Sequence, residues 1–538
     1  MADKIIIIGA GLAGLSAALK SAGSGYEVLL VSSQPSERAQ SVMAEGGINA
    51  ALDTKGEMDS VEQHFQDTMK AGCFMASEPA VKRMTEAAPG IVRDLKKTGV
   101  QFNLDENGEP DLRNFGGQKK KRTAFAKSDT GKQIMTALID EARKYEVSGR
   151  IKRYMHHSFI TLLFSDKQKS RCAGCIIRDD HTGEEIHLTG DAVITATGGM
   201  HGLFGNTTGS RLNTGEVTAE LFRLGVPLIN PEFIQYHPTT AESGGKRMLI
   251  SEAARGEGGR LYADRNGEKW YFMEEKYPDL GNLMPRDITS REIWNVSREY
   301  PVFLDMTGLS KDVFENKLSS ILDDCLTYLH IDPRKEPVPV SPGIHYFMGG
   351  LYTDDFHRTN IPGLFAAGEC CGLYHGANRL GGNSLLGAIH GGQVAAESAC
   401  EYVRDNRGAD TFTQWELFFG RVNVMPDEGD AKDIRNMADG RSDCVINVQT
   451  TDKELKLIQE TLTECMGVVR NGENMAHGLE IIKGIRGPMA RLGEAVCLAG
   501  INRLESRGAH FREDHPEMSD EYCRCSIVQY DRGEITMI

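Results

Sequence analysis

The feature that most constrains this chain is an alternation of strand, glycine-rich turn and helix close to its first residue. An apolar run, Ile5–Ile8, leads into the turn GAGLAG at residues 9–14, and Leu15–Ser21 then opens a helical segment. A second apolar strand follows at Tyr26–Val31. This order predicts the first βαβ unit of a dinucleotide-binding fold.

Each glycine of this turn has a separate physical task. Gly9 makes the tight turn, Gly11 lets the backbone approach a pyrophosphate, and Gly14 lets the helix pack on the strand. Ala13 lies in the same turn, and the N-terminal end of the helix then faces the phosphates. An NAD enzyme would carry an acidic residue after the second strand, but Ser32 stands there, whose hydroxyl can still bind a ribose.

Two later strands end in similar glycine turns. Asp191–Gly199 ends in ATGG, with Thr197, Gly198 and Gly199 as expected cofactor contacts, and Ile361–Glu369 ends in AAGE, with Glu369 as another. Together with the first βαβ unit they form the triplet typical of FAD-binding folds. Because the three segments lie far apart, the FAD-binding domain is predicted to be discontinuous.

The predicted fold class is α/β, with a discontinuous Rossmann-like FAD-binding domain, an inserted α+β capping domain and a C-terminal helical domain. The expected boundaries are 1–228 and 344–405 for the FAD-binding domain, 229–343 for the cap, 406–520 for the helical domain and 521–538 for a tail. Amphipathic patterns at Lys453–Leu462 and Gly478–Ile501 predict the C-terminal helices.

Charge and cysteine content exclude several classes of protein. The net charge of −15 over 538 residues argues against general binding to nucleic acid or to anionic membranes. No signal peptide or membrane span is evident, so we expect a soluble, cytoplasmic chain. The 12 cysteines are sparse, and Cys172 and Cys175 lie in a strand-like segment, which indicates buried thiols and predicts no metal site.

The longer motifs resemble those of one enzyme family, the flavoprotein subunits of succinate dehydrogenase and fumarate reductase, a group that also contains L-aspartate oxidase. The similar segments, in the family's order, are AEGGINAAL from residue 44, FGGQ at 115–118, EFIQYHPT at 232–239, SEAARGEGG at 251–259, PRDITSR at 285–291, FLDMTGL from 303, HYFMGG at 345–350, HGANRLGGNSLL at 375–386 and ESRGAHFRED at 505–514. The resemblance covers nearly the whole chain and implies bound FAD. Further FAD contacts that we expect are Ser41, Gly46, Gly47, Glu216, Asn383, Ser384 and Leu385.

The resemblance also implies a clamp for a small dicarboxylate. His345 and Arg379 match the pair that holds one carboxylate, while His237, Ser251 and Glu252 match the group at the other end. The planar guanidinium of an arginine suits the two oxygens of a carboxylate. An isolated histidine is more often a hydrogen-bonded core residue, and that alternative stays open for each histidine separately.

Arg286 matches the family's proton donor, and Arg286, Glu252 and Arg255 match its proton relay. Because arginine has a pKa above about 12, it donates a proton only if a neighbour replaces it quickly. Glu252 and Arg255 are three residues apart and would share one face of a helical turn. A purely electrostatic role for Arg286 remains the alternative.

Two departures from the family pattern indicate which of the family's activities this chain has. Respiratory members carry flavin on a histidine, but Gln40 takes that place here, and an amide cannot form the bond. FAD is therefore expected to be non-covalent, which favours fumarate reduction or aspartate oxidation over succinate oxidation. Phe115 stands where aspartate oxidases have a glutamate for the substrate ammonium, and this favours fumarate reduction, with L-aspartate oxidase as the alternative.

The electron supply must come from outside the chain, because it has no haem or second flavin module. The resemblance implies fumarate and succinate as small-molecule partners and an iron–sulfur subunit as electron donor, which could hold the chain at the cytoplasmic face of a membrane. A stand-alone enzyme that uses a soluble flavin or oxygen is the alternative. A flavoprotein scaffold without turnover is disfavoured, because all the clamp residues are present.

Overall fold

The computed structural model describes residues 3–127, 129–165, 171–406 and 450–538. Its central element is a parallel sheet in the order β20-β10-β1-β2-β6. The strands are β1 (Lys4–Ile8), β2 (Glu27–Ser32), β6 (Ile151–Met155), β10 (Ala192–Thr195) and β20 (Leu364–Ala366). The three glycine-turn strands expected from the sequence thus lie side by side, because β10 pairs with both β1 and β20. The predicted α/β fold with a discontinuous FAD-binding domain is confirmed.

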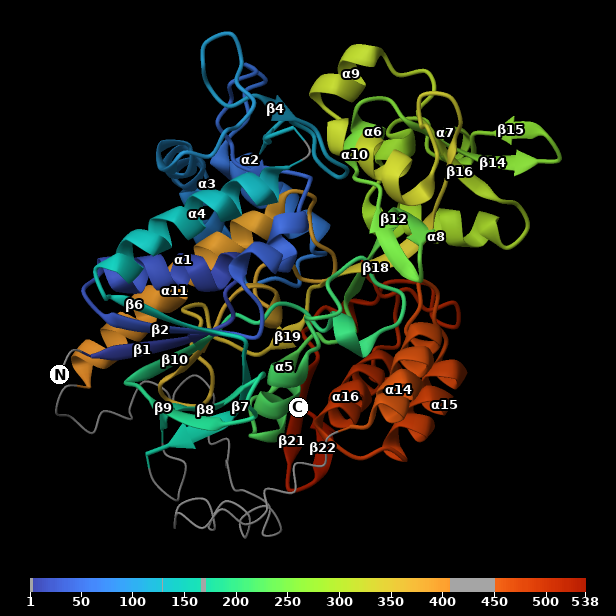
Figure 1. The fold of residues 1–538 in the computed structure, drawn as a ribbon. Coiled ribbons are helices and arrows are strands. Elements are labelled where there is room, and N and C mark those ends of the chain that lie inside the picture. The colour runs from blue at the N-terminus through green and yellow to red at the C-terminus, as the bar shows by residue number, and fades with distance from the viewer. Residues whose placement is uncertain (1–2, 128, 166–170, 407–449) are drawn as a thin grey trace.

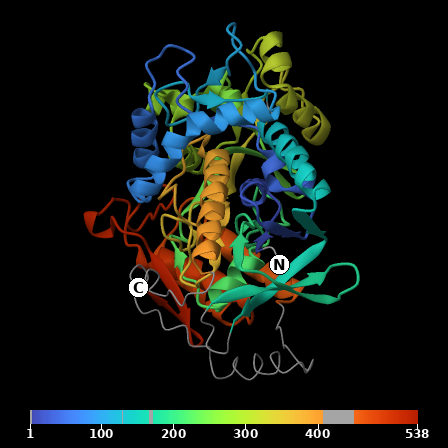
Figure 2. The ribbon, with the colours of Figure 1, turned by 90° about the vertical axis from the view of Figure 1, so that its left-hand side faces the viewer.

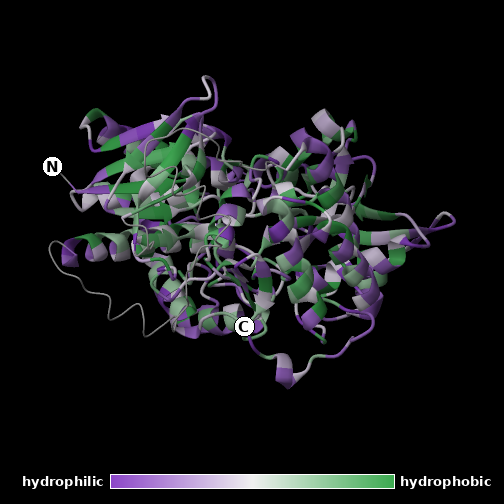
Figure 3. Ribbon diagram, turned by 90° about the horizontal axis from the view of Figure 1, so that it is seen from below, coloured by the Kyte–Doolittle hydropathy of each residue, from purple (hydrophilic) through white to green (hydrophobic). Residues whose placement is uncertain are grey.

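Helices cover one face of this sheet, and the antiparallel strands His157–Phe164, Cys172–Asp179 and Glu185–Thr189 pack on its other face, so that its strands are buried on both sides. The residues of β1 from Ile5 to Ile8 are buried, and α1 (Leu12–Gly23) packs against the long helix α11 (Asn383–Asp405). Figure 2 shows α11 in orange among the blue and cyan helices α3 (Glu78–Thr98) and α4 (Thr130–Val147). Figure 3 shows mostly hydrophobic colours along the strands near the N-terminus and hydrophilic ones on outer loops. Helix α11 therefore begins at the edge where the glycine turns end.

The inserted segment forms a separate body at the upper right of Figure 1. One sheet joins β13 (Lys246–Leu249), β12 (Ile234–Ser243) and β18 (Ser341–Phe347), and another joins β15 (Glu268–Trp270), β14 (Arg260–Arg265), β16 (Val302–Asp305) and β17 (Val338–Pro339). Helix α8 (Arg286–Ser297) packs on β12. This segment has its own apolar cluster, which includes Leu261, Ile293 and Leu304. Strands and helices are mixed, as the expected α+β cap requires.

The C-terminal helices differ in one respect from the sequence prediction. The pattern at 478–501 was interpreted as one segment, but it is divided between α15 (Gly472–Lys483) and α16 (Pro488–Asn502), which follow α14 (Asp452–Cys465). The chain breaks there because Gly487 has a φ of 105°, and Pro488 then begins the next helix. Residues 407–449 of the predicted helical domain lie outside the described residues.

The predicted tail is an ordered β-hairpin. Strands β21 (Ile527–Asp531) and β22 (Glu534–Met537) pair with each other, and β21 also pairs with β11 (Leu228–Ile229), which joins β19 (Gly350–Leu351). The end of the chain is therefore part of a sheet with strands that precede the cap and follow it in the sequence. Its apolar residues, such as the buried Val528, make that docking favourable.

The other elements complete the three bodies. They are β3 (Ile48–Asn49), α2 (Val61–Ala71), β4 (Leu112–Arg113), β5 (Thr123–Ala124), β7 (His157–Phe164), β8 (Cys172–Asp179), β9 (Glu185–Thr189), α5 (Glu216–Arg223), α6 (Ala253–Gly256), α7 (Phe272–Lys276), α9 (Lys311–Asn316), α10 (Ser319–Asp324), a π-helical turn η5 (Cys325–Leu329) and short 3₁₀ turns, of which η2 (Gln40–Met43) bears on the site. Cys172 and Cys175 are buried free thiols in β8, as predicted.

A substitution at Gly14 tests the close contact between α1 and the glycine turn, on which the βαβ unit depends. A Cβ added there would stand 1.8 Å from the backbone oxygen of Gly9, so we expect Gly14→Ala to destabilise the fold by about 3 kcal/mol. Gly90→Ala is the matched control, because Gly90 lies in α3 with no atom near its Cβ direction, and it should stabilise by about 1 kcal/mol. Chemical denaturation measures both, and equal stability of the two variants would contradict this account.

Candidate active site

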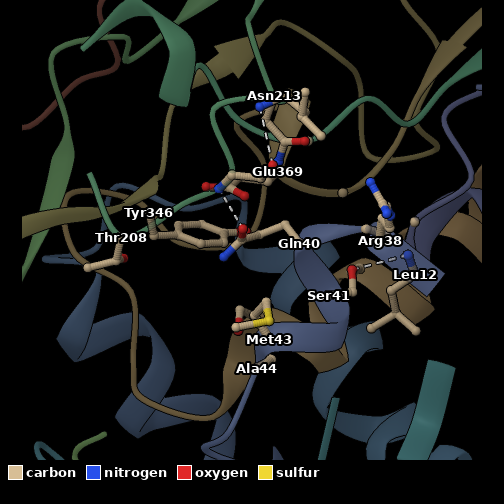
Figure 4. Close-up of a pocket in the computed structure, with 18 of the residues that line it drawn as sticks. Leu12, Arg38, Gln40, Ser41, Met43, Ala44, Thr208, Asn213, Tyr346 and Glu369 are labelled. Carbon is tan, nitrogen blue, oxygen red and sulfur yellow. Dashed lines mark hydrogen bonds between the residues drawn. The ribbon is translucent and has the colours of Figure 1, made fainter. Parts of the chain in front are cut away.

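One cavity of about 800 Å³ runs between the FAD-binding body and the cap. The glycine turn, η2, the loop 206–217, the β12–β13 hairpin and the first turn of α11 line it. Figure 4 shows Gln40, Ser41 and Met43 on the wall that η2 forms. The cavity is larger than a four-carbon acid needs, so it has room for a second, larger ligand.

The glycine turn makes the cofactor half of this cavity. Gly9 has a φ of 107°, and a Cβ there would stand 2.2 Å from the backbone oxygen of Ala196. At Gly11 a Cβ would meet only side-chain atoms at 3.6 Å or more, so the backbone is open to the cavity. The backbone N–H of Leu12 donates to Ser41 Oγ at 3.2 Å, as Figure 4 shows. This end of α1, with its free N–H groups and positive dipole, suits a pyrophosphate.

Most residues expected to touch FAD lie along this half. Those that line the cavity are Gly9, Gly11, Ala13, Ser32, Ser41, Gly46, Gly47, Thr197, Gly198, Glu216, Glu369, Ser384 and Leu385. Ser32 Oγ donates to the backbone oxygen of Gln34, which leaves its lone pairs as acceptors. Glu369 accepts from the N–H of Phe347 and lies 3.3 Å from His201 Nε2.

Three expected cofactor residues do not line the cavity. Gly14 packs α1 on the turn, and Gly199 makes room for the Glu369 carboxylate, which a Cβ there would approach to 2.6 Å. Asn383 is buried behind the wall, where its oxygen accepts from Asn49 Nδ2 at 2.7 Å and its amide donates to Thr68 Oγ1 at 2.9 Å. Asn383 thus fixes the start of α11, while Ser384 and Leu385 reach the cavity.

Gln40 uses its side chain to hold a neighbouring loop. Its oxygen accepts a hydrogen bond from the backbone N–H of Ser210 at 2.6 Å, and it lines the cavity beside Ser41. Thr208, in the same loop, bonds His345 Nδ1 at 2.9 Å. The loop therefore connects the wall at Gln40 with a histidine of the expected substrate clamp.

The buried carboxylate of Glu252 is the centre of the cap half. One oxygen accepts from Arg286 Nε at 2.9 Å, and the other accepts from the backbone N–H of Gly116 at 2.7 Å. Arg255 Nη2 lies 3.8 Å from this second oxygen. Burial raises the pKa of Glu252, but the guanidiniums of Arg286 and Arg255 outweigh it and hold the pKa below its usual value. Glu252 is therefore an anion that joins the cap to the FAD-binding body.

Gln235 was missed in the sequence, although it lies in the EFIQYHPT motif two residues before His237. Its side-chain oxygen accepts from Arg286 Nη1 at 3.0 Å and from Arg379 Nη2 at 2.9 Å. The period-2 spacing on β12, which puts Gln235 and His237 on one strand face, was the available signal. Thr208 was also missed, and no local pattern marked it.

The rings of the two expected histidines contact each other on the cavity wall. The rings of His237 and His345 lie edge to face with centroids 5.1 Å apart, and both line the cavity. Burial, and the positive charges of Arg286 and other arginines, lower the pKa of both well below the usual value. Each is therefore neutral at pH 7 and acts through hydrogen bonds rather than charge.

Within this contact group, positive charges outnumber negative ones. Arg255 and Arg286 pair with the carboxylate of Glu252, and Arg379 joins the group through Gln235, which adds no charge. The buried Nε of Arg379 has no hydrogen-bond partner. The group therefore carries a net charge of +2, which a ligand with two carboxylates would neutralise.

The structure brings all the expected substrate residues and Arg286 together at the cavity, and only the expected relay residue Arg255 lies outside its lining. His237, Ser251, Glu252, Arg286, His345, Arg379 and Phe115 all line the cavity. Phe115 is buried beside Gly46, whose Cβ would stand 3.1 Å from its ring. Arg255 does not line the cavity, but lies behind Glu252 with Nη1 donating to the backbone oxygen of Asn282 at 2.5 Å. Arg255 is therefore placed to pair with Glu252 or to exchange protons with it, but not to touch a substrate.

Comparison with known proteins identifies the family. A model described as FAD binding domain matches residues 4–385, and one described as fumarate reductase flavoprotein C-term matches residues 487–537. The succinate dehydrogenase flavoprotein subunit of Bacillus subtilis is 40% identical, over 96% of this chain and 92% of that protein. The chain belongs to the succinate dehydrogenase/fumarate reductase flavoprotein family. The resemblance expected from its motifs is confirmed, and members of this family are FAD-dependent oxidoreductases.

Two further comparisons place the chain within this family. A chain of Escherichia coli quinol fumarate reductase superposes with a TM-score of 0.86 at 27% identity, over 99% of this chain and 96% of that one. The L-aspartate oxidase of Streptomyces coelicolor is 32% identical, over 98% of this chain and 91% of that protein, and is the more distant relative. In the part of this flavoprotein that the structure describes, no helix has both the length and the apolar character needed to cross a bilayer.

Proposed function

We propose that this flavoprotein reduces fumarate to succinate with non-covalently bound FAD and with electrons from a separate protein. The observation that carries the proposal is the net charge of +2 on the arginine group: Arg286, Arg379 and Glu252 line a cavity next to the glycine cradle for FAD, and Arg255 stands directly behind Glu252. Fumarate has two carboxylates, one for each excess charge. FAD, when bound, supplies the hydride for one alkene carbon.

The clamp residues would hold the acid at both ends. Arg379, with its unpaired Nε, and His345, oriented by Thr208, suit one carboxylate. His237 and Ser251 suit the other, because both line the cavity on the cap side. Buried donors without partners gain most from an anionic ligand, since such hydrogen bonds are stronger than neutral ones.

Arg286 would give the proton to the second alkene carbon. Its Nε and Nη2 both lie within 3 Å of one Glu252 oxygen, and Arg255 stands on the other side of that carboxylate. Arg255 would pass a proton to the Glu252 carboxylate, which would pass it on to Arg286, and water would then reprotonate Arg255. One hydride and one proton convert fumarate to succinate, so the chain needs to deliver only this proton.

The rate of flavin reoxidation tests the proposal. Fumarate should rapidly reoxidise the photoreduced flavin of the purified protein under anaerobic conditions, as followed at the flavin absorption band. Arg286→Gln should slow this step by at least about 100-fold, the usual effect of removing a general acid. Arg260→Gln is the matched control, because Arg260 is an exposed cap arginine paired with Glu274 and should leave the rate unchanged. Near-normal rates in Arg286→Gln, with unchanged fumarate affinity, would contradict the role of Arg286.

L-aspartate oxidation is the second candidate, because the Streptomyces relative carries that name. The ammonium of aspartate would need a carboxylate, but Phe115 is apolar and Glu252 is already paired with two arginines. Leaving an ammonium unpaired in a buried site costs several kcal/mol. Reduction of the oxidised flavin by L-aspartate, with no response of the reduced flavin to fumarate, would favour the oxidase instead.

The attachment of FAD has its own test. Gln40 lines the cavity where respiratory members carry their flavin-linking histidine, and its amide is engaged with Ser210. We therefore expect acid precipitation to leave the yellow colour in the supernatant. Colour that stays with the pellet would show a covalent bond and would contradict this part of the proposal.

The electron donor is proposed to be an iron–sulfur subunit, and the Bacillus relative is itself named a subunit. This arrangement is consistent with a cytoplasmic chain that associates with a membrane only through its partners. Purification from the native source under mild conditions should recover a second, iron-containing chain. Recovery of the flavoprotein alone, active with free reduced flavin, would favour a stand-alone enzyme.

A further inference from the structure

Gln235 occupies an unusual position for a neutral side chain. It is fully buried in β12, and its one oxygen accepts hydrogen bonds from Arg286 Nη1 at 3.0 Å and Arg379 Nη2 at 2.9 Å. Its nitrogen donates to Asn378 Oδ1 at 2.7 Å and to the backbone oxygen of Arg379 at 2.8 Å. All four hydrogen-bonding positions of the amide are therefore filled.

The partners also fix which way the amide points. A guanidinium has only donors, so a flipped Gln235 would direct its NH₂ group at two other donors and lose every bond. The oxygen must face Arg286 and Arg379. These two arginines come from different parts of the chain, the start of α8 and the loop before α11. A single neutral atom thus sets the spacing of the proton donor and the carboxylate binder.

A carboxylate is the usual partner of buried arginines, but the side chain at position 235, between Arg286 and Arg379, is a neutral amide. Glu252 already pairs with Arg286 on its other side. A second carboxylate at 235 would lower the net charge of the contact group from +2 to +1. Burial and the nearby charge of Arg286 lower the pKa of Arg379 and outweigh the opposing effect of Glu369 and Glu252, which agrees with two positive charges that lie close together.

We propose that Gln235 determines specificity for dianions: its neutral oxygen spaces Arg286 and Arg379 while leaving both charges for a substrate with two carboxylates. This inference rests on the proposed function and predicts that a monocarboxylate binds less tightly than a dicarboxylate. A purely packing role for Gln235 would predict no dependence of affinity on ligand charge.

Gln235→Glu adds a charge at constant size and accepts from the same two arginines, but it loses the two bonds that the amide nitrogen donates to Asn378 and to the Arg379 backbone. Gln235→Met loses the same two bonds without adding a charge and therefore controls for their loss. We expect the dissociation constant of fumarate to rise at least 30-fold, since a negative charge would stand close to the bound dianion. The constant for trans-crotonate, which is fumarate with a methyl group in place of one carboxylate, should rise only about 5-fold, because its single carboxylate experiences about half the repulsion. Perturbation of the flavin spectrum of the oxidised holoenzyme measures both constants at equilibrium, without turnover.

Gln235→Met separates spacing from charge, because methionine keeps the net charge but removes the oxygen. The ratio of the dissociation constants of fumarate and crotonate should stay within 3-fold of its value in the unmodified protein. Reoxidation of the reduced flavin by saturating fumarate should slow at least 10-fold, because Arg286 loses an acceptor that orients it. Gln101→Glu, on an exposed loop, is the control for added charge and should change neither quantity.

The outcomes distinguish this inference from the proposed function. The inference would be overturned if Gln235→Glu, with full FAD content, kept the ratio of fumarate to crotonate dissociation constants of the unmodified protein. It would also be overturned if Gln235→Met changed that ratio as much as Gln235→Glu does. An unmodified protein that binds fumarate no better than crotonate would overturn the proposed function itself. Selective loss of fumarate binding in Gln235→Glu alone supports both.

Discussion

The buried carboxylate of Glu252 is the interaction on which the active site depends. It pairs with Arg286 and Arg255 inside the cap and accepts the N–H of Gly116 from the FAD-binding body. Removing one partner from a buried ion pair usually costs about 3–5 kcal/mol, because the remaining charge is left without compensation. This one anion therefore joins two bodies and also stands next to the expected proton donor.

The rest of the site divides between two physical tasks. Glycines at the edge of the parallel sheet bring backbone close to a phosphate-bearing cofactor, and the first turns of α1 and α11 border the same space. The cap contributes charge: Arg286 and Glu252 come from it, whereas Arg379 comes from the loop before α11. In the proposed reaction, a substrate held between them would lie against the cofactor only while both bodies are in contact, and the cap would then exclude water.

Local patterns predicted the parts of the fold that depend on neighbouring residues. The three glycine turns identified β1, β10 and β20, because each turn follows its own strand directly in the sequence. Contacts between distant segments were not predictable: Gln235 bonds Arg379, and Thr208 bonds His345, across more than a hundred residues. Asn383 was expected to touch FAD, but it lies behind the wall because its amide is used by Asn49 and Thr68. The division of α15 from α16 depends on one positive φ at Gly487.

The most direct test of the central claim is a crystal structure of the oxidised holoenzyme with fumarate bound. We predict that one carboxylate of fumarate binds Arg379 and His345 and that the other lies near His237 and Ser251. Arg286 should point at one alkene carbon, and the flavin ring should contact the other. Glu252 should keep its bonds to Arg286 and Gly116. Fumarate bound outside the arginine group, or Arg286 turned away from it with Glu252 unpaired, would contradict this account.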